Sequence, residues 1–250
     1  METVKTYPLT NRTVAGLTTQ KAGNFHLFQP DTSQGIIFGR EVFRLIGDDD
    51  KARCKRPIFV MDARNHTGHV FAWPEEKPPH AEKVCDGVIW SHEGMAICFP
   101  GGCPILTFVD EEKNLFGILH CSWKTIGQRI ITNFNTTWLF NGGRPKNTSV
   151  RFLPAICQDC LTFDLRYWEK EVREPLEWTG VCLEEFSQMK EDRIGLSLAR
   201  LSTSILQGCG YTRIENDGVC TCCSGEYWCY RHHDVPGGER FRNAAFLLVE

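Results

Sequence analysis

The chain has 250 residues, a formal net charge of −3 and 42% hydrophobic residues. This length supports a substantial core, and the weakly acidic balance argues against a surface that attracts nucleic acid or anionic membranes as a whole. The sequence contains no stretch of about 18 apolar residues, the length that would predict a membrane span. The N-terminus also lacks the apolar segment of a signal peptide. We therefore expect one cytoplasmic domain over residues 1–250.

Short strands and turns are predicted for residues 1–45, with several glycines between them. Apolar runs rich in β-branched and aromatic residues then predict strands, which lie at residues 57–61, 70–73, 84–90 and 95–99. His66 falls between the first two of these strands. Taken alone, His66 is most simply interpreted as a loop histidine. It can act as a metal ligand only if other ligands lie near it in the folded chain.

A β-hairpin is predicted next, with strands at 104–109 and 114–120 joined by the polar residues 110–113. With a loop of those four residues, Val109 faces Asn114 and Cys103 lies opposite His120. Side chains that face each other in this way have Cβ atoms about 5 Å apart. A thiol and an imidazole at that distance can share a metal ion or act as nucleophile and base. The alternative is that both are ordinary residues at strand ends.

The second half of the chain contains further helices and strands. Residues 123–140 have apolar side chains at helical spacing, and residues 169–190 predict a helix in pieces, interrupted at Pro175 and Gly180. Residues 194–207 form the clearest predicted helix, and strands are predicted at 150–156 and 241–249. Strands and helices are interspersed along the chain, so we expect an α+β or mixed α/β class.

The chain contains 13 cysteines. The count is odd and no secretion signal is visible, which favours reduced thiols over a disulfide framework. Cys157 and Cys160 have the Cys-x2-Cys spacing of metal ligands, and a second group of cysteines lies at 220–229. The two groups could together hold a structural zinc ion, although thiols shielded from solvent are the favoured interpretation.

Several short motifs, in this order, resemble those of the laccase-domain family, also called the multicopper polyphenol oxidase or peptidoglycan-editing-factor family. The matches are Arg64-Asn-His66-Thr-Gly-His-Val70, Asp86-Gly87, Gly102-Cys103-Pro104, His120-Cys-Ser-Trp123-Lys124, Leu153-Pro-Ala-Ile156 and Trp228-Cys-Tyr-Arg231-His232. Each motif is weak alone, but with a further match at Thr19-Gln-Lys-Ala-Gly23 they extend from about residue 18 to the C-terminus. The resemblance implies a β-sandwich-like core of mixed sheets flanked by helices, similar to a toxin domain with a Cys–His pair.

The resemblance also implies a metal site made of His66, Cys103 and His120. Two imidazoles and a thiolate leave the fourth position of a tetrahedral zinc ion open, as in catalytic sites. Copper accepts the same donors, so zinc is preferred without being required. A metal ion in this position would keep Cys103 ionised and lower the pKa of a bound water molecule to about 7.

The activity implied by the resemblance is phosphorolysis of adenosine, inosine, guanosine or methylthioadenosine, together with deamination of adenosine. Lys124 and Arg231 are the candidates for binding phosphate. The expected partners are therefore small molecules, a purine nucleoside and phosphate, with no nucleic acid and no membrane.

Three alternatives stay open. The first is copper-dependent oxidation of phenols, although the sequence has no His-x-His pairs and lacks the combination of copper sites expected of a true laccase. The second is hydrolysis of an amide in a cell-wall precursor, with Cys103 as nucleophile and His120 as base. The third is a metal-binding scaffold without catalytic activity.

Four positions depart from the family pattern, in which an aspartate precedes the cysteine and arginines occupy three other sites. The residues found there are Gly102, Gln20, Lys124 and His232. A lysine cannot make the planar bidentate contact of an arginine, so anion binding is less secure here than in the family at large. These departures favour a diverged substrate or a weaker enzyme.

Overall fold

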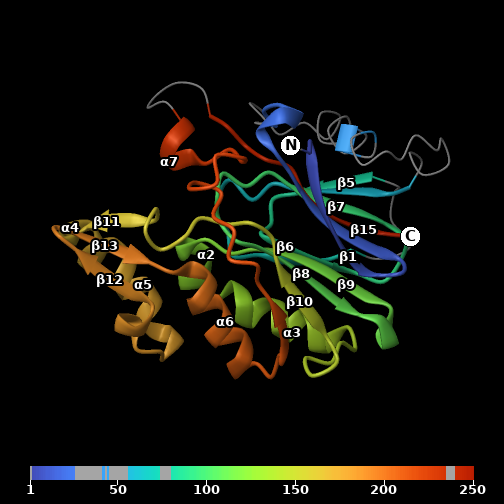
Figure 1. Cartoon of the computed structure of the whole chain (residues 1–250). Helices are drawn as coiled ribbons and strands as arrows, with labels where there is room; N and C mark the ends of the chain where they lie inside the picture. The colour runs from blue at the N-terminus through green and yellow to red at the C-terminus, as the bar shows by residue number, and fades with distance from the viewer. Residues whose placement is uncertain (1, 26–40, 43, 45–55, 74–79, 235–239) are drawn as a thin grey trace.

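Two six-stranded mixed sheets, packed face to face, form the core of the computed structural model, which describes residues 2–25, 41–42, 44, 56–73, 80–234 and 240–250 (Figure 1). The first sheet contains, in spatial order, β1 (Val4–Thr10), β2 (Thr13–Thr18), β15 (Ala245–Val249), β7 (Gly94–Cys98), β3 (Ile58–Met61) and β5 (His80–Lys83). The second contains β14 (Arg213–Glu215), β10 (Ser149–Phe152), β8 (Ile105–Asp110), β9 (Leu115–His120), β6 (Gly87–Trp90) and β4 (Val70–Ala72). The predicted fold class, mixed sheets flanked by helices, is confirmed.

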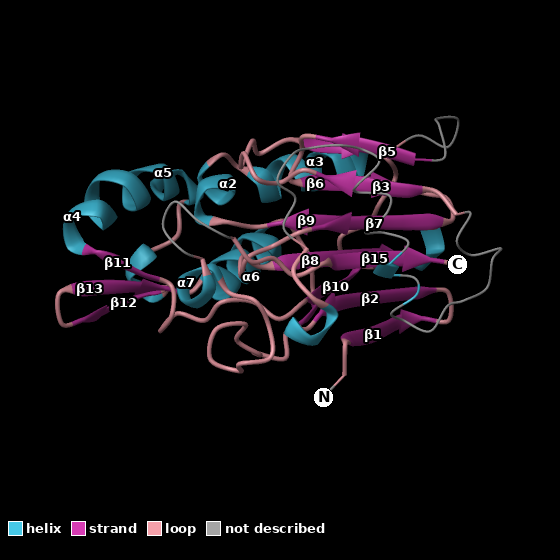
Figure 2. Ribbon diagram, turned by 90° about the horizontal axis from the view of Figure 1, so that it is seen from above, coloured by secondary structure: helices cyan, strands magenta, loops and turns pink. Residues whose placement is uncertain are grey.

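A third, three-stranded sheet extends from one end of the sandwich (Figure 2). It contains β11 (Thr162–Asp164), β13 (Arg193–Leu196) and β12 (Ser187–Lys190). A run of short helical segments connects its strands: α4 (Leu165–Tyr167), a π-helix (Trp168–Arg173), α5 (Glu174–Leu176) and 3₁₀ turns at Glu177–Thr179 and Leu183–Glu185. The other short elements are 3₁₀ turns at Gln20–Ala22 and Glu111–Lys113, and α7 (Tyr230–His233).

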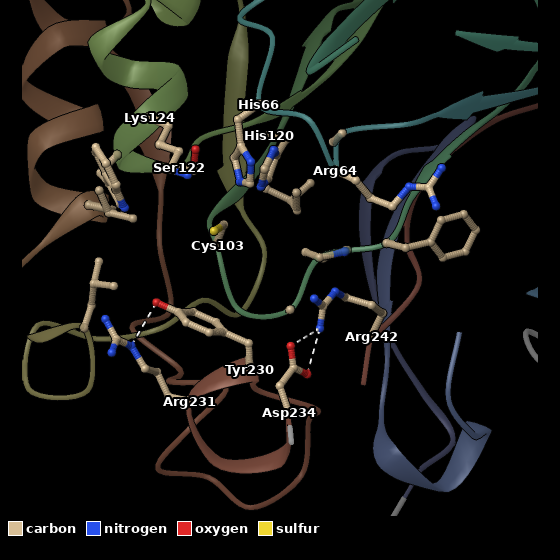
Figure 3. Close-up of a pocket in the computed structure, with 18 of the residues that line it drawn as sticks. Arg64, His66, Cys103, His120, Ser122, Lys124, Tyr230, Arg231, Asp234 and Arg242 are labelled. Carbon is tan, nitrogen blue, oxygen red and sulfur yellow. Dashed lines mark hydrogen bonds and ion pairs between the residues drawn. The ribbon is translucent and has the colours of Figure 1, made fainter. Parts of the chain in front are cut away.

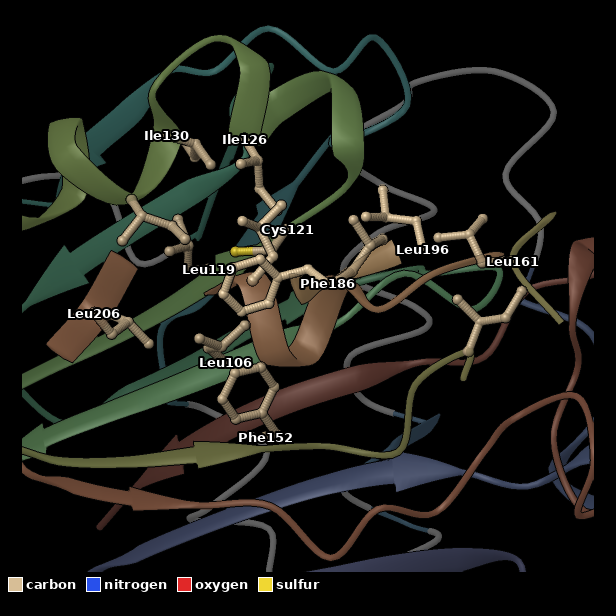
Figure 4. Close-up of a cluster of buried hydrophobic side chains, with 14 of the residues drawn as sticks. Leu106, Leu119, Cys121, Ile126, Ile130, Phe152, Leu161, Phe186, Leu196 and Leu206 are labelled. Atoms are coloured by element: carbon tan, nitrogen blue, oxygen red, sulfur yellow. The ribbon is translucent and has the colours of Figure 1, made fainter. Parts of the chain in front are cut away.

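The second sheet is apolar on both faces. Phe116 and Ile118 of β9 are buried with Leu17 and Leu247 of the first sheet, which makes the interior of the sandwich. Leu119 points to the opposite face, because successive residues of a strand alternate between faces. Three helices cover that face: α2 (Trp123–Gly127), α3 (Ile130–Phe140) and α6 (Leu198–Gly208). Figure 4 shows the resulting cluster, to which the helices contribute Ile126, Ile130 and Leu206.

The helix expected at 123–140 is present as two helices. Its apolar face is buried as predicted, with Ile126, Ile130, Phe134 and Trp138 in the core. The break falls at Arg129, which has the left-handed φ of 63° and starts α3 in a new direction. None of the helices in the described part of the chain combines the length and the apolar character needed to traverse a bilayer.

Two other predicted elements need correction. The helix expected from residue 194 begins only at Leu198, because Arg193–Leu196 pairs with β11 and β12 as a strand. The piecewise helix expected at 169–190 ends before Ser187, where β12 begins. Part of the segment 1–45 lies outside the described residues, and its described portion contains β1 and β2 as expected.

The hairpin exists, but its predicted register is wrong by two residues. His120 pairs with Ile105, not with Cys103, and Val109 pairs with Phe116. The reason is Asp110, which stays in β8 because its buried carboxylate accepts hydrogen bonds from the backbone N–H groups of Lys113 (3.2 Å) and Arg144 (2.9 Å). A two-residue shift keeps each strand residue on its face, but it leaves Cys103 in the loop before β8.

Candidate metal centre

Two loops and the end of a strand bring His66, Cys103 and His120 together. His66 lies in the loop between β3 and β4, Cys103 lies two residues before β8, and His120 is the last residue of β9. Their ligand atoms all lie within 4.8 Å of one another. Figure 3 shows the sulfur of Cys103 turned towards the two imidazole rings. The grouping predicted from the sequence is therefore present, although strand pairing alone does not produce it.

The loops that carry these residues have unusual backbone conformations. His66 adopts a left-handed φ of 50°, which turns the chain sharply after β3. Gly102 has a φ of 132°, a conformation that residues with a side chain rarely adopt. The O atom of Gly102 accepts a hydrogen bond from the N–H of Ile156 at 2.7 Å, which fixes the loop just before Cys103. Glycine at position 102 thus suits the backbone, and a side chain such as aspartate would be strained there.

A buried carboxylate orients the side chain of His120 and fixes the backbone next to His66. Asp86 is fully buried, and its Oδ1 lies 2.9 Å from Nδ1 of His120. Its Oδ2 accepts hydrogen bonds from the N–H of Gly68 (3.0 Å) and the hydroxyl of Thr67 (3.1 Å), in the turn that follows His66. A carboxylate that binds one ring nitrogen of a histidine leaves the other free to bind a metal ion. Asp86 thereby orients the imidazole of His120 and fixes the turn that follows His66.

The metal-free centre holds a thiolate next to an imidazolium. Burial disfavours ionisation of Cys103, but interactions with the imidazoles of His120 and His66 outweigh it and lower the pKa of the thiol to about 6. Burial also disfavours the charged form of His120. Its hydrogen bond to Asp86 and its interaction with Cys103 nevertheless raise the pKa of His120 to about 9. At neutral pH the two groups form an ion pair, and His120 must lose its proton when a metal ion binds.

The low pKa of Cys103 predicts how its reactivity depends on pH. In protein freed of metal, alkylation of Cys103 by iodoacetamide should rise with pH and be half-maximal near pH 6, because the thiolate is the reactive form. Peptide mass spectrometry across a pH series measures this. Cys182 is an internal control, since it is exposed and Glu184 raises the pKa of its thiol. A midpoint for Cys103 in the ordinary thiol range, about 8.5, would contradict the assignment.

A cavity of about 550 Å³ opens in front of the three side chains. Lys124, in the first turn of α2, and Arg231, in α7, both line it. Among the described residues, neither cation has an acidic partner: Lys124 lies over the ring of Trp123, and Arg231 donates to the Tyr230 hydroxyl and the Thr162 carbonyl, each at 2.9 Å. Positive charge without a paired carboxylate favours an anionic ligand.

The cavity wall contains residues that the sequence did not indicate. Arg64 and Arg242 line it as ion pairs, Arg64 with Asp62 at 2.7 Å and Arg242 with Asp234 at 2.9 Å. Stacked aromatic rings, Phe163 and Tyr167, line the side formed by the small third sheet. Arg64 belongs to the His66 motif, and the other residues belong to segments without motifs, so only the folded chain places them together.

Two departures from the family pattern lie away from the cavity. Gln20 donates a hydrogen bond to the carbonyl of Tyr227 at 2.8 Å and lies 3.3 Å from Nε2 of His233, so it holds the segment before α7. His232 is exposed on α7 and does not line the cavity. Of the four substituted positions, Lys124 is therefore the one that lines the cavity.

The chain matches a known protein family over most of its length. A family model described as multi-copper polyphenol oxidoreductase laccase matches residues 49–249, most of the chain. The chain belongs to this laccase-domain family. The resemblance found in the sequence motifs is thus confirmed, and the His-Cys-His centre lies within the matched region.

Relatives in the laccase-domain family carry different names. A Bacillus subtilis protein named purine nucleoside phosphorylase YlmD is 26% identical over 172 residues, which cover 67% of this chain but only 59% of that protein. YlmD from Geobacillus stearothermophilus has a TM-score of 0.77 at 19% identity, covering 98% of this chain and 94% of that one. A Bacillus licheniformis hypothetical protein, YfiH, has a TM-score of 0.74 at 18% identity, covering 95% and 93%. These structures share the fold.

Proposed function

We propose that the chain is a zinc-dependent enzyme that acts on purine nucleosides, with His66, Cys103 and His120 as metal ligands. The observation that carries the proposal is the convergence of these three donors at one end of a cavity that is also lined by Lys124 and Arg231, two cations with no acidic partner among the described residues. The name of the Bacillus subtilis relative, a purine nucleoside phosphorylase, supports the substrate class. Phosphorolysis is the principal reaction proposed, with adenosine deamination as a second.

The donor set fits a catalytic zinc ion. Two imidazoles and one thiolate leave a fourth position free, and Asp86 fixes the His120 ring with one nitrogen available. Because the pKa of Cys103 is low, its side chain is a thiolate at neutral pH even without a bound metal ion. A bound zinc ion would supply a Lewis acid and could lower the pKa of a coordinated water molecule to about 7.

The cavity suits a nucleoside and phosphate together. Its volume of about 550 Å³ lies within the usual range for small-molecule sites. In phosphorolysis, a phosphate oxygen bonds to C1′ of the ribose while the bond from C1′ to the base breaks and its electron pair leaves with the base. Lys124 and Arg231 would hold the phosphate, and Tyr167, whose ring also lines the cavity, offers a flat apolar surface against which a purine ring can pack.

Replacing Lys124 or Arg231 by alanine should weaken phosphate binding. Each charge-assisted hydrogen bond contributes about 1.5–3 kcal/mol, so we expect the KM for phosphate to rise about 10- to 100-fold. Steady-state kinetics with inosine and varied phosphate measure this. Arg213→Ala is a matched control, since Arg213 is exposed on β14 and does not line the cavity. Unchanged KM values for phosphate in both cavity variants would reject their assignment.

The reaction itself is tested with adenosine and inosine, each with and without phosphate. Phosphorolysis predicts adenine or hypoxanthine together with ribose 1-phosphate, only when phosphate is present. Deamination predicts inosine from adenosine in its absence. Product levels no higher than those of the Cys103→Ala variant in every condition would overturn the proposed activity. Metal analysis of the same samples distinguishes zinc from copper. Copper is the metal in the family name, and two histidines with one thiolate can bind either ion.

A second candidate rests on the thiolate–imidazolium pair. In protein without metal, Cys103 and His120 have the protonation states of a nucleophile and its acid–base partner. Amide hydrolysis on a cell-wall precursor would therefore persist or increase after chelation. The zinc enzyme would lose its activity under the same treatment, so one chelation experiment distinguishes the two.

A further inference from the structure

We propose that Cys157, Cys160, Cys220 and Cys223 bind a second, structural zinc ion. The four residues are distinct from the His-Cys-His centre, and their sulfur atoms all lie within 4.8 Å of one another. The described cysteines are free thiols. The proposal does not depend on the substrate of the enzyme.

The spacing of the sulfur atoms matches a tetrahedral ion. The sulfur of Cys223 lies 3.8 Å from that of Cys157 and 3.3 Å from that of Cys160. Zinc–sulfur bonds of about 2.3 Å in a tetrahedron place neighbouring sulfurs about 3.8 Å apart. A disulfide would need them at about 2.05 Å. Four thiols within 4.8 Å of one another, with two of the separations close to this value, therefore surround a space suited to one ion with four ligands.

The sequence presents the ligands in two pairs of the same type. Cys157 and Cys160 form one Cys-x2-Cys pair, and Cys220 and Cys223 form another. Two such pairs are typical of structural zinc sites. The chain joins them through a parallel bridge between Ala155 and Cys220, in which the N–H of Thr221 donates to the carbonyl of Ala155. The fold thus brings together two half-sites that lie far apart in the sequence.

The backbone around Cys220 is arranged as it would be around a metal-bound thiolate. Its sulfur accepts from the N–H groups of Cys157 (3.2 Å), Cys222 (3.3 Å) and Cys223 (3.4 Å). Donors of this kind orient a ligand and stabilise its negative charge. Shielded free thiols, favoured from the sequence, do not fit well here, because Cys223 is exposed and Cys157 and Cys160 are only partly buried. An ion can therefore reach the site from solvent.

This ion would stabilise the loops next to the cavity of the His-Cys-His centre. The loop with Cys157 carries Ile156, whose N–H donates to Gly102 beside Cys103. The segment with Cys223 leads to Tyr230, whose N–H donates to the carbonyl of Gly101 at 2.8 Å. Zinc between the two segments would fix both sides of the loop that carries Cys103. We expect its removal to loosen that loop and to lower the melting temperature.

The test uses the Cys103→Ala variant, which retains all four cysteines of the proposed site. Purified under reducing conditions, it should contain one zinc ion per chain, and X-ray absorption at the zinc edge should give four sulfur neighbours at about 2.3 Å. The wild type should contain two ions. Absence of zinc in the Cys103→Ala variant, nitrogen neighbours around its zinc, or a disulfide between Cys160 and Cys223 would overturn the proposal.

Variants of the site complete the experiment. Cys157→Ser and Cys223→Ser should each reduce the wild-type content from two ions to one and lower the melting temperature, whereas Cys182→Ser, an exposed cysteine outside the site, should leave both unchanged. Two ions per chain in the folded Cys223→Ser variant would contradict the assignment. The proposed nucleoside activity is tested separately, since none of these measurements requires turnover.

Discussion

The Cys103→Ala variant is expected to lose the ion of the His-Cys-His centre and to lower kcat/KM for inosine at least about 1000-fold. Two imidazoles alone hold zinc much more weakly than two imidazoles and a thiolate. Loss of a metal that stabilises developing charge costs several kcal/mol in the transition state, and about 4 kcal/mol corresponds to this factor. Kinetics and metal analysis on the same preparation measure both effects.

The control for Cys103→Ala is Cys182→Ser, an exposed cysteine away from the cavity. This variant should keep the activity and metal content of the wild type. Circular dichroism and thermal unfolding establish that Cys103→Ala is folded, as expected for a partly exposed loop residue outside the core clusters. A folded Cys103→Ala protein with wild-type kcat/KM would exclude Cys103 from the catalytic machinery.

The Asp86→Asn variant should weaken zinc binding about 10- to 100-fold, as loss of an outer partner of a metal-binding histidine usually does. The amide has one acceptor oxygen where the carboxylate has two, so it cannot accept from Nδ1 of His120 and from Thr67 and Gly68 at the same time. Contacts to Thr67 and Gly68, next to His66, are also disturbed. Competition with a chromogenic chelator measures the affinity. Leaving buried donors unsatisfied should additionally destabilise the fold by about 1–3 kcal/mol.

Asp110→Asn provides the matched control for Asp86→Asn. Asp110 is equally buried in the same sheet, but it accepts backbone hydrogen bonds at the far end of the hairpin from the metal centre. Its replacement should lower the free energy of unfolding and leave zinc affinity unchanged. Equal affinities for the two variants and the wild type would mean that Asp86 has only a structural role.

Local patterns in the sequence predicted much of the sandwich. The apolar spacing of Ile126, Ile130, Phe134 and Trp138 identified the buried helical face, and all four side chains are in the core. The pattern could not locate the break at Arg129, because a left-handed residue leaves no mark on apolar periodicity. The predicted helix wrongly includes residues 194–196 for a similar reason: their pairing with β11 and β12 is a long-range contact.

The candidate site was predicted in part. His66, Cys103 and His120 were grouped by family motifs, whereas the hairpin argument placed Cys103 in the wrong register. Asp86 was noticed only as part of a motif, although a lone carboxylate before a fully apolar strand is an unusual signal. The pairing of the four cysteines required the bridge between Ala155 and Cys220, which joins segments more than sixty residues apart and has no signature in either one.

Anomalous diffraction at the zinc edge, from crystals of the protein as purified, is the most direct test of the central site. We expect a peak about 2.0–2.1 Å from one nitrogen of His66 and one of His120, and about 2.3 Å from the sulfur of Cys103. If no anomalous density lies between these three side chains, even in crystals grown with excess zinc, the proposed metal site is contradicted.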